Sequence, residues 1–370
     1  MKIAILGTRG IPNIYGGFEQ FAEILSAGLV EKGHEVTVFN PHYHPYAYKS
    51  FNNVKIVKKY CPERFFGAAA HILYDILCLK HAKKSGFDII LECGYGSAAF
   101  SYMMCRCKNQ RIITNMDGME WKRSKWSFFT RKILKWAEKT TVKKSTAIIA
   151  DHLEIQKYYR EKYGISPVYI PYGAAAIEKP SVRYLRQFGL EENRYFLVIS
   201  RIEPENNIHT ILKGFTAARN DYKIAIISEI KSSYARALKK AYFDYPNVVF
   251  LGPNYNRAEL ESLRFYSKAC FHGHSIGGTN PSLLEAMAAG AFIIAHDNPF
   301  NKGVLDNNAL FFLNYVDIQK IIENIGHHIN QCKENFSENN YQKIKELYSK
   351  EMITRQYEKL FLDIKHPAKS

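Results

Sequence analysis

The chain has 370 residues, 46% of them hydrophobic and 23% charged. The length is right for two domains, between which we expect a cleft, and the composition is that of a soluble globular protein with disorder expected only at the ends. The formal net charge of +16 is uneven: residues 1–175 carry 26 Lys and Arg against 14 Asp and Glu, and the rest carry 25 against 21. The first half therefore attracts anionic partners, such as lipid headgroups, nucleic acid or phosphorylated substrates.

The N-terminal sequence MKIAILGTRG predicts a buried strand that stops at a glycine turn, and not a signal peptide. No stretch approaches the ~18 to 20 apolar residues that cross a bilayer, so we expect a cytoplasmic protein. The seven cysteines include no CxxC pair, and Cys105 and Cys107 lack a second pair that would complete a metal site. We expect free thiols and no metal.

Short apolar runs alternate with helical stretches along the whole chain, which predicts an α/β protein with doubly wound parallel sheets. A helix is predicted from about residue 18 to 31, and the helical spacing at 342–365 predicts a last helix that packs on the domains. The predicted domains are 1–175 and 176–345, followed by a C-terminal helical segment at 346–370. The predicted strands lie at 2–6, 36–40, 89–91, 111–115, 147–150 and 168–170 in the first domain, and at 195–200, 223–227, 248–251, 269–272 and 292–295 in the second.

Ligands of parallel sheets bind beyond the carboxyl ends of the strands, which directs attention to four loops. The first runs from Gly7 to Phe18 and contains the pair Gly16 and Gly17. Glycines let a backbone approach a bound group, and the following helix offers N–H groups to an anion. The loop lacks the GxGxxG spacing, and no acid follows the second strand, so a nicotinamide cofactor is disfavoured.

The second loop gathers two carboxylates, two indoles and three cations between Asn115 and Trp126. Asp117 at the strand tip and Glu120 are candidate catalytic residues, although a polar loop leading into an amphipathic helix would also explain the cations and indoles. The following helix interleaves aromatic residues with nearly one-signed charge, which favours contact with an anionic membrane over a merely solvated face. Its charged residues are Lys122, Arg123, Lys125, Arg131, Lys132, Lys135, Lys139, Lys143 and Lys144 against Glu138.

The third and fourth loops lie in the second half. Arg201, one residue beyond a predicted strand, could grip a diphosphate with its planar fork, or could form a surface salt bridge. In the fourth loop, Thr279 or Asn280 could cap a helix that begins with proline. Glu285 would lie one turn inside that helix and could accept hydrogen bonds from a ribose diol. His274 could reach the donor sugar or phosphate.

Four ordered blocks, GTRGIPNIYGGFE, DGMEWKRSKW, SRIEPENN and HSIGGTNPSLLEAM, together resemble the retaining glycosyltransferases of family four. More narrowly, they are similar to bacterial rhamnosyltransferases of capsule and O-antigen assembly. The resemblance implies two facing Rossmann-like domains in the GT-B arrangement. It also implies that Gly16 and Gly17 meet the donor phosphates, that Arg201 binds the diphosphate, and that Glu285 binds the ribose. Asp117 stands where many relatives carry a histidine beside the reacting sugar.

Two candidate donor-binding residues, Gly277 and Asn206, depart from the family pattern. Gly277 replaces the first glutamate of a Glu-x7-Glu motif, and Asn206 replaces a lysine that usually follows the acid at 205. The loss of one carboxylate and one cation suggests a donor with different hydroxyl groups, such as a deoxysugar. The backbone N–H groups of Gly278 and Thr279 could hold the leaving group instead.

The resemblance implies transfer of a sugar, with L-rhamnose from dTDP-rhamnose as our best expectation, from a nucleotide donor with retention of configuration. The expected acceptor is a lipid-linked saccharide, reached by peripheral contact with the inner face of the cell membrane. We expect no cofactor, no metal and no nucleic-acid partner. The alternatives are a transferase of a UDP- or GDP-hexose, a UDP-sugar epimerase, and a protein that binds nucleic acid or another anionic surface.

Overall fold

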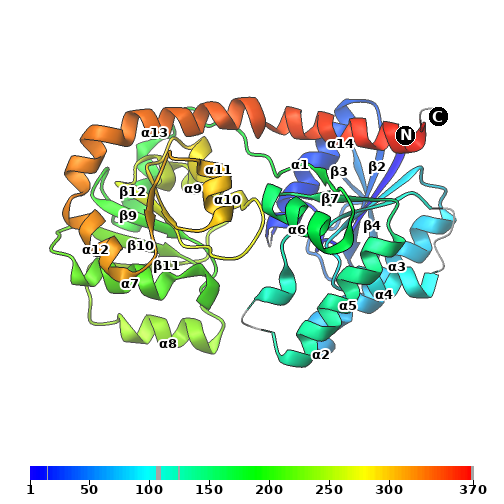
Figure 1. Ribbon diagram of the computed structural model, residues 1–370, viewed down its shortest axis with the longest axis horizontal. Coiled ribbons are helices and arrows are strands. Elements are labelled where there is room, and N and C mark those ends of the chain that lie inside the picture. The colour runs from blue at the N-terminus through cyan, green and yellow to red at the C-terminus, as the bar shows by residue number, and fades with distance from the viewer. Residues whose placement is uncertain (15, 106–109, 124–125, 368–370) are drawn as a thin grey trace. The chain divides into compact units, whose positions relative to one another are not determined.

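The protein divides into two compact units in a computed structural model that describes residues 1–14, 16–105, 110–123 and 126–367 (Figure 1). The first unit combines Met1–Tyr172 with Lys350–Ser370, and the second is Gly173–Ser349. The chain therefore leaves the first unit once and returns to it near its end. The predicted boundary at residue 345 falls inside a helix that ends at Leu347.

The first unit is built on an eight-stranded sheet in the order β3-β4-β2-β1-β5-β6-β7-β8, in which only β3 runs antiparallel to its neighbour. Its apolar strands are covered on both faces by helices, as parallel sheets require. The strands are β1 (Lys2–Leu6), β2 (Glu35–Pro41), β3 (Ser50–Phe51), β4 (Val54–Lys59), β5 (Ile89–Cys93), β6 (Ile112–Asn115), β7 (Ala147–Ala150) and β8 (Val168–Tyr169).

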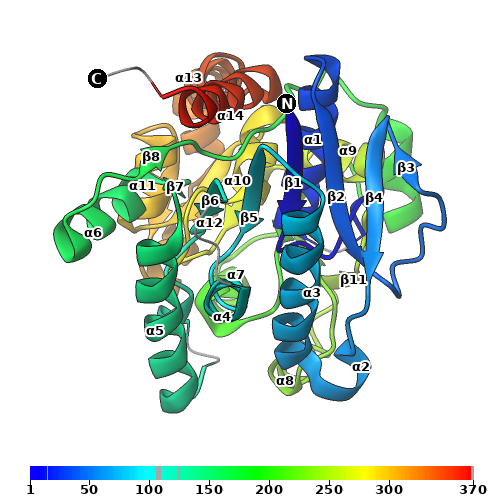
Figure 2. The same ribbon diagram turned by 90° about the vertical axis from the view of Figure 1, so that its right-hand side faces the viewer.

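Successive side chains of β1 point to opposite faces of this sheet. Ala4 and Leu6 pack with helices α3 and α4 in one core cluster, and Figure 2 shows α3 on one side of the sheet and α1 on the other. The helices of this unit are α1 (Gly17–Glu31), α2 (Glu63–Phe66), α3 (Ala70–Lys84), α4 (Ala98–Cys105), α5 (Phe128–Lys144), α6 (Leu153–Tyr163) and α14 (Lys350–Lys365), with 3-10 turns η1 (Gly67–Ala69) and η2 (Glu120–Lys122).

The second unit has a six-stranded parallel sheet in the order β11-β10-β9-β12-β13-β14. Its strands are β9 (Tyr195–Ile199), β10 (Lys223–Ile227), β11 (Val248–Gly252), β12 (Ala269–His272), β13 (Ile293–His296) and β14 (Leu310–Phe312). Its helices are α7 (Ile208–Ala217), α8 (Ser233–Ala241), α9 (Arg257–Phe265), α10 (Pro281–Ala288), α11 (Pro299–Leu305), α12 (Tyr315–Glu323) and α13 (Ile325–Leu347), with 3-10 turns η3 (Val182–Phe188) and η4 (Pro204–Asn206).

Every predicted strand is present within two residues at either end. The helical segment predicted at 342–365 is present and packs its apolar face as predicted, with one break, because α13 ends at Leu347 and α14 begins at Lys350. Six cysteines are free, as predicted, and Cys107 lies outside the described residues. Among the described helices, none combines the length and the apolar character that a membrane span needs.

Candidate active site

Arg201 lies on the loop that leaves the carboxyl end of β9 in the second unit. Its side chain is 58% exposed, and Nη1 lies 3.4 Å from Oε1 of Glu203. Its backbone carbonyl accepts a 2.7 Å hydrogen bond from the Asn206 side chain. The loop backbone is therefore fixed while the guanidinium remains accessible to an anion.

Asn206, a predicted donor contact, has its side chain buried in the Arg201 loop. Its side chain is 2% exposed, and its amide donates to the Arg201 carbonyl. A buried amide used in this way shapes the loop, and a contact of Asn206 with the donor stays a prediction. Asn206 thus supports the backbone that presents Arg201.

The loop after β12 is fastened to the Arg201 loop. A Cβ at Gly273 would lie 2.1 Å from the Asn206 carbonyl oxygen, so only glycine allows this approach. Asn207 Nδ2 donates to the Gly273 carbonyl at 2.8 Å. The N–H and the hydroxyl of Ser275 donate to the Glu205 carbonyl at 3.0 and 2.9 Å. Because β9 and β12 are neighbours in the sheet, both loops form one rigid edge.

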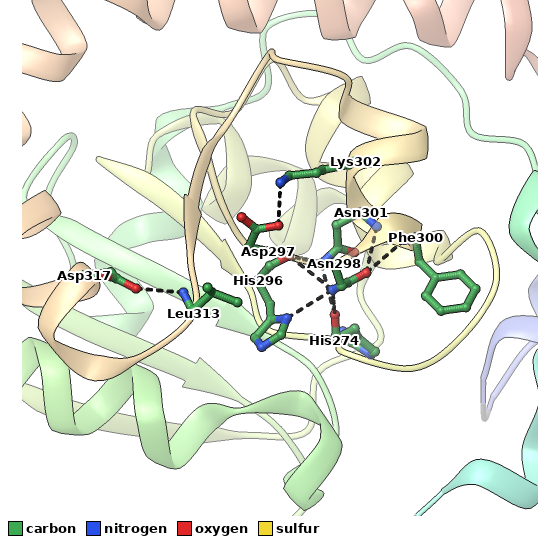
Figure 3. A network of polar contacts seen from close by, with 9 residues as sticks. All are labelled: His274, His296, Asp297, Asn298, Phe300, Asn301, Lys302, Leu313 and Asp317. Carbon is green, nitrogen blue, oxygen red and sulfur yellow. Dashed lines mark hydrogen bonds and ion pairs between the residues drawn. The ribbon is translucent and has the colours of Figure 1, made fainter.

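Two asparagines hold the same loop from the other side (Figure 3). Asn298 Nδ2 and Asn301 Nδ2 donate to the His274 carbonyl at 2.9 and 3.0 Å. They also donate to the His296 carbonyl, at 3.1 and 2.8 Å. The side-chain oxygen of Asn298 caps α11 by accepting from the N–H groups of Phe300 and Asn301, both at 3.0 Å. The backbone around His274 is thus held at a set position.

Helix α10 begins at this edge, as predicted. Asn280 is its N-cap, with Oδ1 accepting from Ser282 N at 2.9 Å, and Pro281 is its first residue. The Ser282 hydroxyl donates to the carbonyl of Ile199 at the end of β9, at 3.1 Å. The start of α10 is therefore bonded to the strand end that precedes Arg201 by two residues. Thr279 is 1% exposed, so its side chain is part of the packing.

The glycines of this loop leave room beside it. A Cβ at Gly277 would meet no heavy atom within 4 Å. Gly277, Gly278 and His274 are all half-buried. A Cβ at position 277 would therefore find open space.

Glu285 is held by a buried arginine that no sequence motif marked. Arg264 of α9 is 4% exposed, and its Nη2 donates to Oε2 of Glu285, whose side chain is 25% exposed. A charge-assisted bond of this kind fixes the direction of the carboxylate. Arg264 also lines a small cavity of about 10 Å³ together with Leu197, Ile199, Cys270, Phe271, His272, Ser282, Ala286 and Ile293.

His272 and His274 stack on each other, with ring centroids 4.5 Å apart and an interplanar angle of 14°. Burial lowers the pKa of His272 to about 3, so this imidazole is neutral at physiological pH. Within the described residues, no group of three or more His, Cys, Asp and Glu side chains is placed to hold a metal ion.

In the first unit, Asp117 follows β6 with a positive φ of 53°. Its N–H donates to Oδ1 of Asn115 at 3.0 Å, and its Oδ1 accepts from the Tyr172 hydroxyl at 3.4 Å. Burial raises the pKa of Asp117, the nearby charge of Arg123 opposes this, and Glu120 adds to it. The strand tip thus carries a half-buried carboxyl group whose pKa stays raised despite the nearby Arg123.

Glu120, the second predicted catalytic carboxylate, contacts its own loop. Its Oε1 accepts from the Trp126 indole at 3.0 Å, and its Oε2 lies 2.7 Å from Nε of Arg123. These contacts brace the turn around residue 120, so a role in chemistry stays a prediction. Ser124 and Lys125 of the same block lie outside the described residues.

Glu138 is the acid on which the aromatic residues around α5 converge, and its side chain is fully buried. Oε2 accepts from the Trp121 indole at 2.9 Å. Oε1 accepts from the Tyr158 hydroxyl, the Lys162 ammonium and the Tyr163 hydroxyl at 2.9, 2.9 and 2.7 Å. Glu138, the one acid of α5, therefore has a structural role. The sequence does not reveal this role, because the four donors lie 17 to 25 residues away along the chain.

The glycine pair opens α1, as the family pattern implies. Gly16 is the N-cap, with its N–H bonded to Oδ1 of Asn13 at 3.2 Å, and Gly17 is the first helical residue and exposed. Glu19 in the first turn is buried, and its Oε1 accepts from Arg9 N at 2.7 Å. Burial raises the pKa of Glu19. Tyr15 lies outside the described residues.

A basic and aromatic surface covers α5 and the adjoining α4. Phe128 and Phe129 at the start of α5 are 67% and 76% exposed, and Met103 and Met104 of α4 are 53% and 63% exposed. Phe100 and Trp136 join the two helices, with ring centroids 4.9 Å apart. The exposed lysines of α5 are Lys132, Lys135, Lys139, Lys143 and Lys144.

Comparisons with known proteins agree with this architecture. Residues 1–175 match a domain of unknown function, DUF1972, and residues 183–343 match the family described as Glycosyl transferases group 1. A search of curated proteins found no match. Among solved structures, sucrose-phosphate synthase from Thermosynechococcus elongatus superposes with a TM-score of 0.82 at 15% identity, over 98% of both chains.

Two further structures share the fold. Anabaena HepE in complex with UDP-glucose gives a TM-score of 0.76 at 14% identity, over 97% of this chain and 99% of HepE. A glycosyltransferase from Rickettsia africae gives 0.73 at 12% identity, over 99% of both chains. At these identities the likeness establishes the GT-B fold, and the match over residues 183–343 establishes the class of enzyme.

Proposed function

Because this chain is a glycosyltransferase with the GT-B fold, we propose that it takes a sugar from a nucleotide donor held by the second unit. The observation that carries this proposal is the rigid edge where β9 and β12 end. There the accessible guanidinium of Arg201 follows the strand to which Ser282 of α10 is bonded. A cationic fork and a helix N-terminus at one strand edge suit a diphosphate. HepE, which shares the fold, has been crystallised with UDP-glucose.

Glu285 would hold the ribose of this donor. Its carboxylate lies in the first turns of α10 and is oriented by Arg264. A carboxylate fixed by one partner can accept hydrogen bonds from a diol with little loss of conformational entropy. Gly278 and Thr279 would offer backbone N–H groups to the leaving diphosphate.

We favour L-rhamnose, from dTDP-rhamnose, as the transferred sugar. The family pattern places a glutamate near the sugar and a lysine near the diphosphate. Here Gly277 has no side chain and open space beside it, and the Asn206 amide bonds to the Arg201 carbonyl. Fewer polar partners favour a sugar with fewer hydroxyl groups, since an unmatched polar group is costly to bury.

Transfer would retain the anomeric configuration: the acceptor hydroxyl attacks from the face that the diphosphate leaves and passes its proton to the departing phosphate. Asp117 would stabilise positive charge at the sugar ring.

Donor binding is tested by thermal shift with dTDP-rhamnose, UDP-glucose and GDP-mannose. We expect dTDP-rhamnose to raise Tm most, and Arg201→Met to weaken its binding about 10- to 100-fold, because a charge-assisted contact to phosphate contributes ~1.5–3 kcal/mol. Arg194→Met is the matched control, since this arginine precedes the other end of β9 and is 51% exposed. Equal loss in both variants would contradict the site, and product analysis with each stabilising donor separates a transferase from an epimerase.

We also propose that the acceptor is a lipid-linked saccharide at an anionic membrane, which the surface of α4 and α5 would contact. The exposed lysines could contact the anionic lipid headgroups, while the neighbouring exposed phenylalanines insert into the apolar layer beneath them. Lys132 lies over the Phe128 ring, 4.5 Å from its centroid, so charge and apolar surface are adjacent.

Membrane contact is tested by sedimentation with vesicles of phosphatidylglycerol and phosphatidylcholine. We expect binding that falls with salt, and a loss of about 10-fold or more on replacing Phe128 and Phe129 with serine, since burying one such ring is worth ~1.5–3 kcal/mol. Phe243→Ser is the control, because this residue of the second unit is 79% exposed. Binding that ignores salt and both substitutions would exclude this surface.

A further inference from the structure

A chain of hydrogen bonds ties Asp117 to helix α14. Oδ1 of Asn115 accepts from the Asp117 N–H at 3.0 Å, while Nδ2 of Asn115 donates to the Tyr357 hydroxyl at 3.1 Å. A backbone N–H can bond only to the oxygen of an amide, so the orientation of Asn115 is fixed and its NH2 group must face Tyr357. Asn115 and Tyr357 are both 0% exposed, so water does not compete for these bonds.

Tyr172 reaches the same aspartate directly. Its side chain is 5% exposed, and its hydroxyl donates to Oδ1 of Asp117 at 3.4 Å. Burial raises the pKa of Tyr172 well above its usual range. The phenol therefore keeps its proton and acts towards the carboxylate only as a donor.

One aromatic cluster holds both phenols in place. Phe21 of α1 packs against Tyr172 and Tyr357, with ring centroids 5.4 and 5.2 Å apart, and Phe361 packs on Tyr357 at 5.9 Å. Phenylalanine at positions 172 and 357 would make the same ring contacts as tyrosine. The two hydroxyl groups add a cost of desolvation, which is repaid here by bonds to Asp117 and to Asn115.

We propose that Tyr172 and Tyr357 are positioning residues for sugar transfer. Tyr172 orients the Asp117 carboxylate, and Tyr357 acts through Asn115 to hold the Asp117 backbone in its left-handed conformation. Helix α14 thus supports the loop that carries Asp117, in addition to packing on α1. The inference rests on the proposed role of Asp117 in transfer.

The first test compares Tyr172→Phe and Tyr357→Phe with Tyr159→Phe, measuring release of nucleoside diphosphate from the donor that the thermal-shift panel identifies. Tyr159 is 1% exposed and its hydroxyl bonds to no described residue, so it controls for loss of a buried hydroxyl. We expect kcat to fall about 10-fold in Tyr172→Phe and about 3-fold in Tyr357→Phe, with the donor KM unchanged. Activities equal to that of the control would overturn the proposal.

The pH profile separates positioning from general damage. A hydrogen bond to a carboxylate lowers its pKa, so Tyr172→Phe is expected to move the acid limb of kcat upwards by about half a pH unit, whereas Tyr159→Phe leaves it in place. The other groups around Asp117 are Arg123, Glu120 and the Cys93 thiol, and all remain in each variant. An unmoved acid limb in Tyr172→Phe would count against direct orientation.

A double substitution shows whether the tyrosines act through Asp117. If they do, adding Tyr172→Phe or Tyr357→Phe to Asp117→Asn lowers kcat no further. If the tyrosine substitutions instead cause independent structural damage, their fold-losses in kcat multiply with that of Asp117→Asn. Near-normal kcat in Asp117→Asn alone would refute the proposed role of Asp117. A strong effect of Asp117→Asn together with silent tyrosine variants would refute only the positioning role.

Hydrogen exchange gives a readout that needs no substrate. We expect the peptide covering residues 112–122 to exchange about 10-fold faster in Tyr357→Phe than in Tyr159→Phe, because the Asn115 amide loses the partner that holds it. Exchange equal to that of the control would show that Tyr357 does not hold this loop, whatever the activity.

Discussion

Asp117→Asn is expected to lower kcat by about 100- to 1000-fold while leaving donor affinity within a few-fold of the original. The substitution preserves shape, and the amide oxygen can still accept the Tyr172 hydroxyl, so only the negative charge is removed. A desolvated carboxylate acts on a developing positive charge much more strongly than one in water, because the local dielectric is low. The measurement is turnover of the active donor, with donor affinity determined separately by calorimetry.

The same carboxylate sets a sign for the pH dependence. Its pKa is raised by burial, so kcat should begin to fall at a higher pH than an ordinary aspartate would produce, as acid protonates the group. Asp117→Asn should lack this acid limb. An acid limb that persists in the variant would assign it to another residue.

Glu138→Ala is expected to lower the free energy of unfolding by about 3 to 5 kcal/mol, the range for breaking a buried charge network. Four donors converge on this fully buried carboxylate, and each loses its acceptor at once. Glu138→Gln should cost less, because the retained oxygen can still serve the donors that now share Oε1. Chemical denaturation monitored by tryptophan fluorescence provides the measurement.

The matched control for this prediction is Glu161→Ala, on the neighbouring α6, where the side chain is exposed. Its effect should stay within about 0.5 kcal/mol, as for surface substitutions generally. A loss of less than about 1 kcal/mol in Glu138→Ala would mean that the four bonds barely exceed the cost of burying the charge.

Most strands of the two modules follow from local pattern, which is why sequence alone predicted them. Runs such as IAIL at 3–6 and YFLVI at 195–199 are apolar throughout, as expected of strands buried on both faces. Strands β3 and β14 were not predicted, because two and three residues carry too little pattern. The mixed pattern VKIVKK of β4 is that of a half-buried strand and was also overlooked.

The candidate site was predictable where it depends on local chemistry. The N-cap Asn280 and Pro281 of α10 are recognisable from their order in the sequence. The support of each site residue was not predictable, because it comes from distant segments: Arg264 reaches Glu285 across 21 residues, and Tyr357 reaches Asn115 across 242. Asn206 illustrates the same limit, since the sequence does not show that its side chain is buried and bonded to the Arg201 carbonyl.

The return of α14 to the first unit also orders events during synthesis. Residues 173–349 are translated before residues 350–365, so the whole second unit is made while the first still lacks a helix. Until α14 has been made, Phe21 of α1 lacks its ring contact with Tyr357, and the surface at Gly28 lacks its contact with Thr354. A ribosome-bound chain stopped before residue 350 should therefore hold a folded second unit beside a first unit that is open to proteases and chaperones.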